Sequence, residues 1–448
     1  MRLMDLDAIF KAYDIRGVYP GELDEEVAHR VGRAFVQLLG ARAVVVARDM
    51  RASGEPLSTA FIAGAVTQGA DVVDIGIAST DMLYFASGSL NLPGVVFTAS
   101  HNPARYNGMK LVRAGALPVG SETGMAEIKT MVADGDFERP PRLGKITRQD
   151  MLDAFVEHVL GFVDVPNFEP LKVVIDTANG MGGLVVPAVF SRLPIDVVPL
   201  YFDLDGTFPN HPADPIQPEN LKDLREAVVA NDAACGLAFD GDADRVFFVD
   251  ERGEPVLASF LGALLADSIL AKHPGERVIY SLTCSRAVPE VIRERGGEAI
   301  RTRVGHSFIK QIMADTGAIF GVEHSGHFYL RDHWRAECGV VTALAALEVV
   351  SRSGGTLSKA LEPFTSRYWN SGEINSSVEA KQEKIEELAG AHPGAAQDRT
   401  DGLSVDYDDW WFNVRASNTE PLLRLNVEHR DPAEGAARRD ELLAVIRA

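Results

Sequence analysis

Cysteine is scarce in this sequence. Cys235, Cys284 and Cys338 are the three cysteines among 448 residues, and they are widely spaced. An odd number of cysteines without a C-x-x-C pair argues against both a disulfide framework and a zinc site. A reducing compartment is the simplest setting for such a chain, so we expect a cytoplasmic protein.

Positive charge is also scarce. The chain has 44 lysines and arginines against 64 aspartates and glutamates, which gives a net charge of −20 at pH 7. This balance disfavours nucleic acid as a partner, because phosphate backbones are held by broad basic surfaces. An acidic protein that binds a small phosphate must gather its few cations locally, so the position of each Arg and Lys is informative.

A signal peptide and a long apolar run are missing as well. The first residues, MRLMDLDAIFKAYDIRG, carry charges where a signal peptide has an apolar segment. The most apolar stretch, Leu257–Ala271, contains Asp267 and, at about 15 residues, is too short to span a bilayer. We therefore expect a buried helix at this stretch and no membrane association.

Short β-branched runs alternate with longer amphipathic segments, a pattern that is typical of α/β layers. A strand, a helix-like segment, a second strand and a third strand that leads into a polar loop recur three times. The first strands of these repeats are Val44–Ala47, Val173–Asp176 and Val278–Leu282, and a helical stretch over 148–163 separates the first two repeats. The third strands lead into polar loops at 95–103, 236–245 and 318–327.

The C-terminal remainder has a different pattern. Strand-like segments at 368–378 and 409–414 flank a helical segment at 379–388, and a last helix is predicted over 432–448. The sequence thus predicts three related α/β domains with mixed sheets and a smaller α+β C-terminal domain, with boundaries 1–147, 148–253, 254–364 and 365–448. Ligands of open α/β sheets bind at the carboxyl ends of strands, so we expect the polar loops to meet around a central cleft.

The first polar loop contains a candidate nucleophile. Its sequence from Thr98 to Lys110 is TASHNPARYNGMK, and Ser100 stands directly after an apolar strand. A serine hydroxyl is a weak nucleophile until a base or a cation acts on it. His101 and Lys110 are the local candidates to activate Ser100 or to steady a phosphate on it. A short S-H-N-P string is also typical of a polar turn, so the motif alone leaves both interpretations open.

The second polar loop places carboxylates at alternate positions, Asp240, Asp242 and Asp244. Three such oxygens in a short loop suit a hard cation such as Mg²⁺, and without a metal they would repel one another. An EF-hand needs Gly at its sixth position, where Arg245 stands, and a strand follows where the calcium loop would continue. A solvated acidic turn is the alternative without a metal.

Two further loops carry groups that suit a sugar phosphate. In Glu323-His324-Ser325-Gly326-His327, the Glu and Ser side chains can hydrogen-bond adjacent sugar hydroxyls. Upstream, Gly305-His306-Ser307 leads to Lys310, which is within reach of a phosphate. The string at 415–421, RASNTEP, with Arg424 beyond it, has the hydroxyls, amides and guanidinium of an anion nest. A structural His loop and a capped turn between strands are the alternatives.

Together these four loops resemble the α-D-phosphohexomutase superfamily, in its phosphomannomutase/phosphoglucomutase branch. The resemblance covers nearly the whole chain in the right order, and the Ser100 loop and the D-G-D-x-D-R string are its most specific parts. It implies four domains around a deep cleft. It also implies an isomerase that interconverts hexose 6-phosphate and hexose 1-phosphate through a phosphoserine, with a hexose 1,6-bisphosphate as intermediate and activator.

The resemblance also implies roles for single residues. Ser100 would be the phosphoserine and would bind one Mg²⁺ per chain together with Asp240, Asp242 and Asp244. His101, Lys110 and His327 are candidates for the proton transfer, and the sequence does not choose among them. Residues that would bind the hexose phosphate are Tyr13, Arg16, Arg245, His306, Lys310, Glu323, Ser325, Arg415, Ser417, Asn418 and Thr419.

Two positions depart from the family pattern. Thr283 stands where many members have a lysine, and Ala336–Gly339 replaces a common Asp-Gly pattern. We expect these changes to affect substrate preference more than chemistry. The resemblance of the loop at 323–327 to the phosphomannomutase branch implies mannose phosphate, with glucose and glucosamine phosphates as alternatives. A phosphatase and a non-catalytic sugar-phosphate sensor are the competing functions, disfavoured by the anion loop and by the retained Ser100 and aspartates, respectively.

Overall fold

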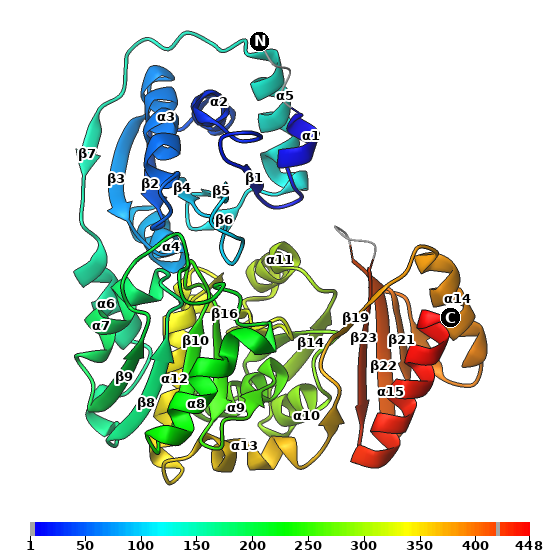
Figure 1. Cartoon of the computed structure of the whole chain (residues 1–448). Helices are drawn as coiled ribbons and strands as arrows, with labels where there is room; N and C mark the ends of the chain where they lie inside the picture. The colour runs from blue at the N-terminus through cyan, green and yellow to red at the C-terminus, as the bar shows by residue number, and fades with distance from the viewer. Residues whose placement is uncertain (1–4, 418–421) are drawn as a thin grey trace. The chain divides into compact units, whose positions relative to one another are not determined.

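The structure is a computed structural model of the chain and describes residues 5–417 and 422–448. It divides into two compact units (Figure 1): the first combines Met1–Pro255 with His327–Leu357, and the second combines Val256–Gly326 with Ser358–Ala448. The segment 327–357 thus packs with the N-terminal half of the chain.

The first sheet of the first unit has the strand order β1-β5-β4-β2-β3-β7, with β6 beside β5. Its strands are β1 (Ile15–Val18), β2 (Ala43–Arg48), β3 (Asp71–Ile77), β4 (Gly94–Phe97), β5 (Tyr106–Arg113), β6 (Leu117–Pro118) and β7 (Ile146–Arg148). The helices are α1 (Leu6–Ile9), α2 (Glu25–Leu39), α3 (Gly54–Thr67), α4 (Thr80–Leu90) and α5 (Ala126–Asp134). Apolar side chains of α2, α3 and the buried strands, among them Phe35, Phe61 and Phe97, form one core.

The second sheet of the first unit contains the order β11-β10-β8-β9. Its strands are β8 (Leu171–Asp176), β9 (Ile195–Leu200), β10 (Cys235–Phe239), β11 (Val246–Asp250) and β12 (Pro255–Val256), and the helices are α6 (Leu152–Leu160), α7 (Gly182–Phe190), α8 (Lys222–Ala230) and α12 (Gly339–Arg352). β10 turns back antiparallel into β11, with Phe239 opposite Val246. The loop 240–245 therefore leaves the carboxyl end of β10. A short antiparallel pair, β16 (Phe328–Leu330) and β17 (Ala336–Glu337), also belongs to this unit.

The second unit contains the parallel set β14-β13-β15 and an antiparallel sheet in the order β18-β23-β22-β21-β20, with β19 beside β23. The strands are β13 (Arg277–Ser281), β14 (Glu298–Thr302), β15 (Phe320–Val322), β18 (Trp369–Asn370), β19 (Ile374–Ser377), β20 (Ala396–Asp398), β21 (Leu403–Asp406), β22 (Trp410–Ala416) and β23 (Leu422–His429). The helices are α9 (Ala258–Lys272), α10 (Ala287–Glu294), α11 (His306–Thr316), α13 (Leu357–Thr365), α14 (Lys381–Ala391) and α15 (Pro432–Arg447). α14 and α15 cover one face of the antiparallel sheet around Phe412 and Leu425 (Figure 1).

The three repeats share one strand arrangement. In each repeat the first strand lies between the second and the third, as β3-β2-β4, β9-β8-β10 and β14-β13-β15. All six pairings are parallel. The predicted fold class, three related α/β domains followed by a smaller α+β domain, is confirmed. The buried helix expected at 257–271 is present as α9.

Two predicted elements differ from the structure. The helix predicted from Arg148 begins at Leu152, because Arg148 ends the edge strand β7 and the Asp150 carboxylate accepts the Leu152 N–H at 2.9 Å. The single strand predicted at 368–378 is divided into β18 and β19, and Gly372 between them has φ +67°. This left-handed conformation interrupts the extended backbone.

Cys235, Cys284 and Cys338 are free thiols, and all three are buried. Within residues 5–417 and 422–448, no single helix is long and apolar enough to cross a membrane. α12 and α13 would pass that test only when they are counted together, by length and composition.

Helices α2 and α3 cross in backbone contact, and two glycines make this possible. A Cβ atom on Gly32 would lie 2.4 Å from the Phe61 carbonyl oxygen, and one on Gly64 would lie 2.1 Å from the His29 carbonyl oxygen. Both distances are shorter than any real contact, and the opposing atoms belong to the backbone of the other helix. The crossing therefore requires glycine at both positions.

We predict that Gly64→Ala lowers the free energy of unfolding by about 1–3 kcal/mol, the usual cost of overpacking, because α2 must move away from α3. Urea unfolding followed by circular dichroism measures this loss. Ala63→Ser, on the exposed side of the same helix, is the control and changes the free energy by about 0.5 kcal/mol. A Gly64→Ala variant as stable as the control would contradict the proposed close crossing.

Candidate functional site

Two loops of the first unit meet at Ser100. β4 is buried along its length and ends at Phe97, so that Thr98 to Ser100 leave the carboxyl end of the strand. Ser100 is 5% exposed and has φ +49°, which is unusual for a residue with a side chain. The Ser100 N–H donates to Thr98 Oγ1 at 2.9 Å. This conformation turns the serine toward the loop that follows β10.

The Ser100 hydroxyl lies among three polar groups. Its Oγ donates to Asp240 Oδ2 at 2.9 Å and lies 3.2 Å from His101 Nδ1. Arg245 Nη2 donates to Ser100 Oγ at 3.2 Å. The backbone approach is equally close, because a Cβ atom on Gly241 would lie 2.4 Å from the Ser100 carbonyl oxygen. The structure thus brings the predicted nucleophile and the predicted aspartate loop together.

The three aspartates form a buried cluster. Asp240, Asp242 and Asp244 each offer one carboxylate oxygen, and these oxygens lie within 4.8 Å of one another. Among the residues that the structure describes, Asp242 Oδ1 and Asp244 Oδ1 are buried oxygens with no hydrogen-bond partner. Unsatisfied buried oxygens are costly unless a ligand completes them. The donor set, all carboxylate oxygen, fits a hard divalent cation such as Mg²⁺.

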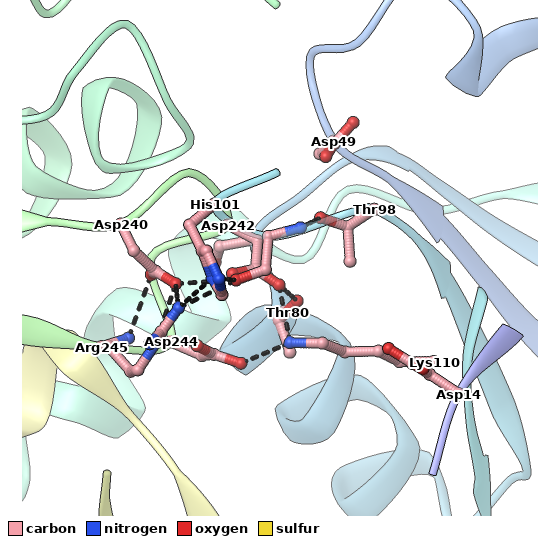
Figure 2. A network of polar contacts seen from close by, with 12 residues as sticks. Asp14, Asp49, Thr80, Thr98, His101, Lys110, Asp240, Asp242, Asp244 and Arg245 are labelled. Carbon is pink, nitrogen blue, oxygen red and sulfur yellow. Dashed lines mark hydrogen bonds and ion pairs between the residues drawn. The ribbon is translucent and has the colours of Figure 1, made fainter. Parts of the chain in front are cut away.

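Two cations offset most of this negative charge (Figure 2). Lys110 Nζ donates to Asp242 Oδ2 at 2.7 Å and to Asp244 Oδ2 at 2.6 Å. Arg245 donates to Asp240 Oδ2 from Nε at 3.0 Å and from Nη2 at 2.7 Å. Figure 2 shows Arg245 and Lys110 reaching the carboxylates from different sides. Three carboxylates against two cations leave one negative charge in excess.

The protonation of the cluster follows from burial and from this excess. Burial, with Asp242 and Asp244 nearby, raises the pKa of Asp240 to about 7, although Arg245 opposes the shift. Burial would raise the pKa of Asp242 too, but Lys110, the Thr80 hydroxyl and Arg245 together outweigh it and hold that pKa well below its usual range. Burial lowers the pKa of Lys110, yet the two aspartates raise it well above its ordinary value. Lys110 is therefore a fixed cation.

His101 is held as a neutral imidazole. Arg245 Nη2 lies 2.6 Å from His101 Nδ1, and because a guanidinium can only donate, Nδ1 must carry the lone pair. Burial, followed by the charges of Arg245 and Arg16, lowers the pKa of His101 to about 3. The Nδ1 lone pair therefore accepts from Arg245, and Nδ1 lies 3.2 Å from Ser100 Oγ.

Thr80 is a residue of this site that the sequence analysis missed. It is the first residue of α4, and its Oγ1 donates to Asp242 Oδ2 at 2.6 Å, while its N–H donates to the Asp242 carbonyl at 3.1 Å. Thr80 is fully buried. The string Ser79-Thr80-Asp81 is typical of a helix start. The sequence therefore predicts a helix cap here but gives no sign that Thr80 contacts Asp242.

The segment 336–339, whose sequence departs from the family pattern, packs beneath the aspartate loop. Cys338 Sγ donates to Asp81 Oδ2 at 3.2 Å, and burial raises the pKa of Asp81 to about 7. A Cβ atom on Gly339 would lie 2.5 Å from the Ala243 carbonyl oxygen. In the first unit, this segment therefore supports the backbone of the aspartate loop.

The remaining candidates of the first unit lie in different places. Arg16 donates to Asn102 Oδ1 and to Asp14 Oδ2, each at 2.6 Å, which brings it to the Ser100 loop. Tyr13 is half-buried and lies near Gly120: a Cβ atom on Gly120 would lie 3.6 Å from the Tyr13 ring. The ring of His327 stacks on Tyr329, with centroids 6.3 Å apart.

The second unit carries the candidate sugar loop. The Glu323 carboxylate is buried and accepts the Gly305 N–H at 2.9 Å, which joins the E-H-S-G-H loop to the start of α11. Lys310, one helical turn further along α11, is also buried, and Ser325 is half-buried. His306 is the first residue of α11, and its side chain lies outside the described part of the structure.

The candidate anion loop follows β22 in the second unit. Arg415 Nη2 and Arg424 Nη1 donate to the two oxygens of the Glu373 carboxylate, at 2.8 Å and 3.0 Å. Among the described residues, the Nε atoms of both arginines are buried without a partner. Ser417 is buried, and Asn418 and Thr419 lie outside the described residues. Two guanidinium groups thus share one counterion beside the predicted loop.

Comparison with known proteins gives a consistent result. Models of phosphoglucomutase/phosphomannomutase domains match along the chain: alpha/beta/alpha domain I over 7–139, domain II over 153–253, domain III over 258–368 and the C-terminal domain over 373–445. A phosphomannomutase of Salmonella montevideo is 39% identical over 450 residues, covering 98% of each chain. A protein named phosphohexose mutases from Xanthomonas campestris pv. campestris is 40% identical over 429 residues, covering 95% of each.

Solved structures agree with these matches. The crystal structure of a phosphoglucomutase/phosphomannomutase family protein from Burkholderia thailandensis has a TM-score of 0.89 and 35% sequence identity. The match covers 98% of this chain and 96% of that one. A putative phosphomannomutase from Thermus thermophilus shares the fold, with a TM-score of 0.80 at 24% identity.

We predict that Thr80→Val weakens the affinity of the aspartate cluster for Mg²⁺ by about 10–100-fold, the usual effect of removing a hydrogen bond to a ligating carboxylate. Valine keeps the shape of threonine but lacks the hydroxyl that orients Asp242. Isothermal titration calorimetry with MgCl₂ measures the affinity. Thr80→Ser keeps the hydroxyl and is expected to bind within about threefold of the parent. Equal affinities for the Val and Ser variants would contradict this role.

We also predict that His101 makes the folded protein sensitive to acid. Its pKa is about 3 in the folded state against 6.5 in the unfolded chain, so below pH 6.5 only the unfolded chain takes up the proton. Stability is therefore lost as the pH falls from 6.5 toward 3. Between pH 7.5 and 5.0 in metal-free buffer, the parent should lose about 2 kcal/mol more than His101→Gln in urea unfolding. Equal losses in the two proteins would refute the neutral assignment.

Proposed function

The chain belongs to the phosphoglucomutase/phosphomannomutase family, and from this premise we propose that it interconverts hexose 6-phosphate and hexose 1-phosphate through a phosphoserine at Ser100. Family membership makes it an enzyme that transfers phosphate within a sugar phosphate, so hexose phosphates are its substrates. The observation that carries the proposal is the 2.9 Å hydrogen bond from the Ser100 hydroxyl to Asp240 in a buried aspartate cluster.

We propose that Asp240, Asp242 and Asp244 hold one Mg²⁺ together with the phosphate on Ser100. The two unsatisfied carboxylate oxygens in the cluster support this assignment. When bound, the ion supplies positive charge to the transferring phosphoryl group, which is the main need of phosphoryl transfer. The family relationship makes a metal-dependent reaction the expected one.

The residues of the Ser100 loop have separate tasks in this proposal. In the first half-reaction the bond between phosphorus and Ser100 Oγ breaks, a bond to the sugar hydroxyl oxygen forms, and Oγ receives a proton. The hexose 1,6-bisphosphate turns over, and its other phosphoryl group then returns to Oγ, which gives the proton up. The proton that Oγ receives is the one that the attacking sugar hydroxyl loses, and in the second half-reaction it passes back to the sugar oxygen that the phosphoryl group leaves. His101 Nδ1 lies 3.2 Å from Oγ and would relay this proton once the Arg245 N–H that its lone pair accepts has turned to the phosphoryl oxygens. Lys110 and Arg245 stay charged and stabilise the phosphoryl oxygens.

The sugar and its second phosphate need further residues. We propose that Glu323 and Ser325 bind the ring hydroxyls and that His327 handles the proton of the sugar hydroxyl. The non-reacting phosphate would be held by Arg415, Ser417, Asn418, Thr419, His306 and Lys310, and Tyr13 and Arg16 would line the site near Ser100. The two guanidinium groups that share Glu373 support an anion site, because a phosphate can replace a shared carboxylate.

Mannose phosphate is the proposed preferred substrate. The printed names of several relatives, including the Salmonella montevideo protein, are phosphomannomutase, which supports mannose. The broader name of the Xanthomonas campestris relative supports use of glucose phosphate as well. We further propose the four domains 1–147, 148–253, 254–364 and 365–448, and a cytoplasmic setting, which the three free thiols support.

The test is an assay of the purified protein with mannose, glucose and glucosamine phosphates, Mg²⁺ and a trace of the matching 1,6-bisphosphate. Isomer formation without release of inorganic phosphate supports the mutase, whereas phosphate release at the same rate would show a phosphatase. Intact mass before and after incubation shows whether one phosphoryl group resides on the chain. Binding of hexose phosphate without turnover of any of them would instead support a sensor.

We predict that Ser100→Ala lowers kcat by at least about 10³-fold, as the loss of a nucleophile usually does, because no acceptor for the phosphoryl group remains. The variant should also lack the added mass of a phosphoryl group. Ser191→Ala is the control, since this exposed serine directly follows α7 and its hydroxyl donates to the Ala188 carbonyl. A Ser100→Ala variant with the activity of this control would end the phosphoserine proposal.

A further inference from the structure

Arg51 is a buried arginine that holds the Ser100 loop by its backbone. Its side chain is 1% exposed and follows β2. Nη2 donates to the carbonyl oxygens of Ser100 at 2.9 Å and of Asn102 at 2.7 Å. Nη1 donates to the carbonyl oxygens of Pro103 at 2.9 Å and of Tyr106 at 3.0 Å. One guanidinium group therefore collects four carbonyls from the loop.

Arg51 is itself held on its other side. Its Nε donates to Asp49 Oδ2 at 3.2 Å, and its N–H donates to Asp49 Oδ1 at 3.0 Å. Asp49 is buried as well, so the charge of the guanidinium is balanced inside the protein. This pairing fixes the direction of the guanidinium plane and hence of its four outward N–H groups.

The same arginine contacts the part of the chain that carries the aspartate loop. The ring of Phe208 covers the guanidinium, with the central carbon 5.0 Å from the ring centroid. A Cβ atom on Gly206 would lie 2.7 Å from the Arg51 Cα atom. Phe208 and Gly206 belong to the loop between β9 and α8, beside the sheet that ends in Asp240. Arg51 thus touches both of the elements that must meet for the reaction.

The conformation of Ser100 explains why such a clamp is needed. Its φ of +49° is disfavoured for a residue with a Cβ atom, and strained conformations persist only where the surroundings enforce them. The Ser100 N–H is fixed by Thr98 and its carbonyl by Arg51. The same carbonyl packs on Gly241. A shift of this peptide would therefore move the Ser100 hydroxyl away from Asp240.

We propose that Arg51 is a positioning residue for phosphoryl transfer, because its guanidinium fixes the Ser100 peptide in the position that lets the hydroxyl contact the aspartate cluster. The inference rests on the proposed role of Ser100. Lysine cannot replace this arginine, since an ammonium group has one nitrogen and cannot bond four carbonyls in one plane. A misplacement of about 1 Å at a reacting atom is enough to cost about 10²-fold in rate.

The test compares Arg51→Lys with the parent and with Arg33→Lys. Arg33 is the matched control, because it also covers an aromatic ring, with its central carbon 4.4 Å from the Phe137 centroid, and donates from Nε to Gln68 at 2.9 Å. Arg51→Lys should lower kcat by about 10²-fold, with KM for the hexose phosphate and the affinity for Mg²⁺ within about threefold. Arg33→Lys should keep kcat within about twofold.

Hydrogen–deuterium exchange separates positioning from general stability. In Arg51→Lys, peptides covering 98–106 should exchange faster, while peptides of α2 and α3 exchange as in the parent. The inference is overturned if kcat per folded molecule is unchanged, whether or not exchange at 98–106 stays at the parent level. If the parent protein shows the slow hydrogen–deuterium exchange of a folded protein but turns over no hexose phosphate, the proposed function is wrong, and this result does not bear on how Arg51 holds the loop.

A second variant serves if Arg51→Lys does not fold. Phe208→Leu keeps all the groups that hydrogen-bond with Arg51 but removes the aromatic ring that covers its guanidinium. Faster exchange at 98–106 and a kcat lowered by about 3–10-fold would support the positioning role. Parent values for both measurements would overturn it.

Discussion

The site depends on the burial of three carboxylates in one hairpin loop. Asp240, Asp242 and Asp244 are at most 4% exposed, and like charges in such a setting repel strongly. Arg245 comes from the hairpin itself, but Lys110 comes from β5 in the other sheet of the first unit. The hairpin loop is therefore stable only when the two sheets meet. The contact between the two sheets also places the Ser100 loop against Asp240. The packing that balances the charge of the aspartates therefore also brings Ser100 to them.

The repeated topology explains how these distant segments reach their positions. In each repeat the first strand is central and the third strand lies beside it, so the third strand always ends at the same edge. β4 leads to Ser100, β10 to Asp240 and β15 to Glu323. One structural position thus carries a candidate nucleophile, a carboxylate cluster and a candidate sugar ligand in the three repeats. The scaffold fixes where a loop emerges, and the loop residues alone decide its chemistry.

The parts of this structure that could be predicted are those with local signals. The strands of the repeats are apolar runs bounded by polar loops, and three alternating aspartates attract attention in any sequence. Thr80 and Arg51 could not be found in this way, because each acts on a partner that the chain brings near only after folding. Thr80 reads as a helix start and Arg51 as a surface charge. The same limit applies to β20 and β21, which are short strands whose pairing depends on neighbours rather than on a pattern of their own.

The charge balance of the cluster also indicates what it is built to receive. Lys110 and Arg245 leave one negative charge in excess, and burial together with this excess raises the pKa of Asp240. A phosphate on Ser100 alone would add nearly two further negative charges to a buried site, at a prohibitive cost. A divalent cation alone would leave a positive excess with no counterion. The two together restore the original balance, so each lowers the cost of binding the other, and this coupling is reciprocal. The charge balance of the cluster therefore supports the proposal that a phosphate and a divalent cation bind there as a pair.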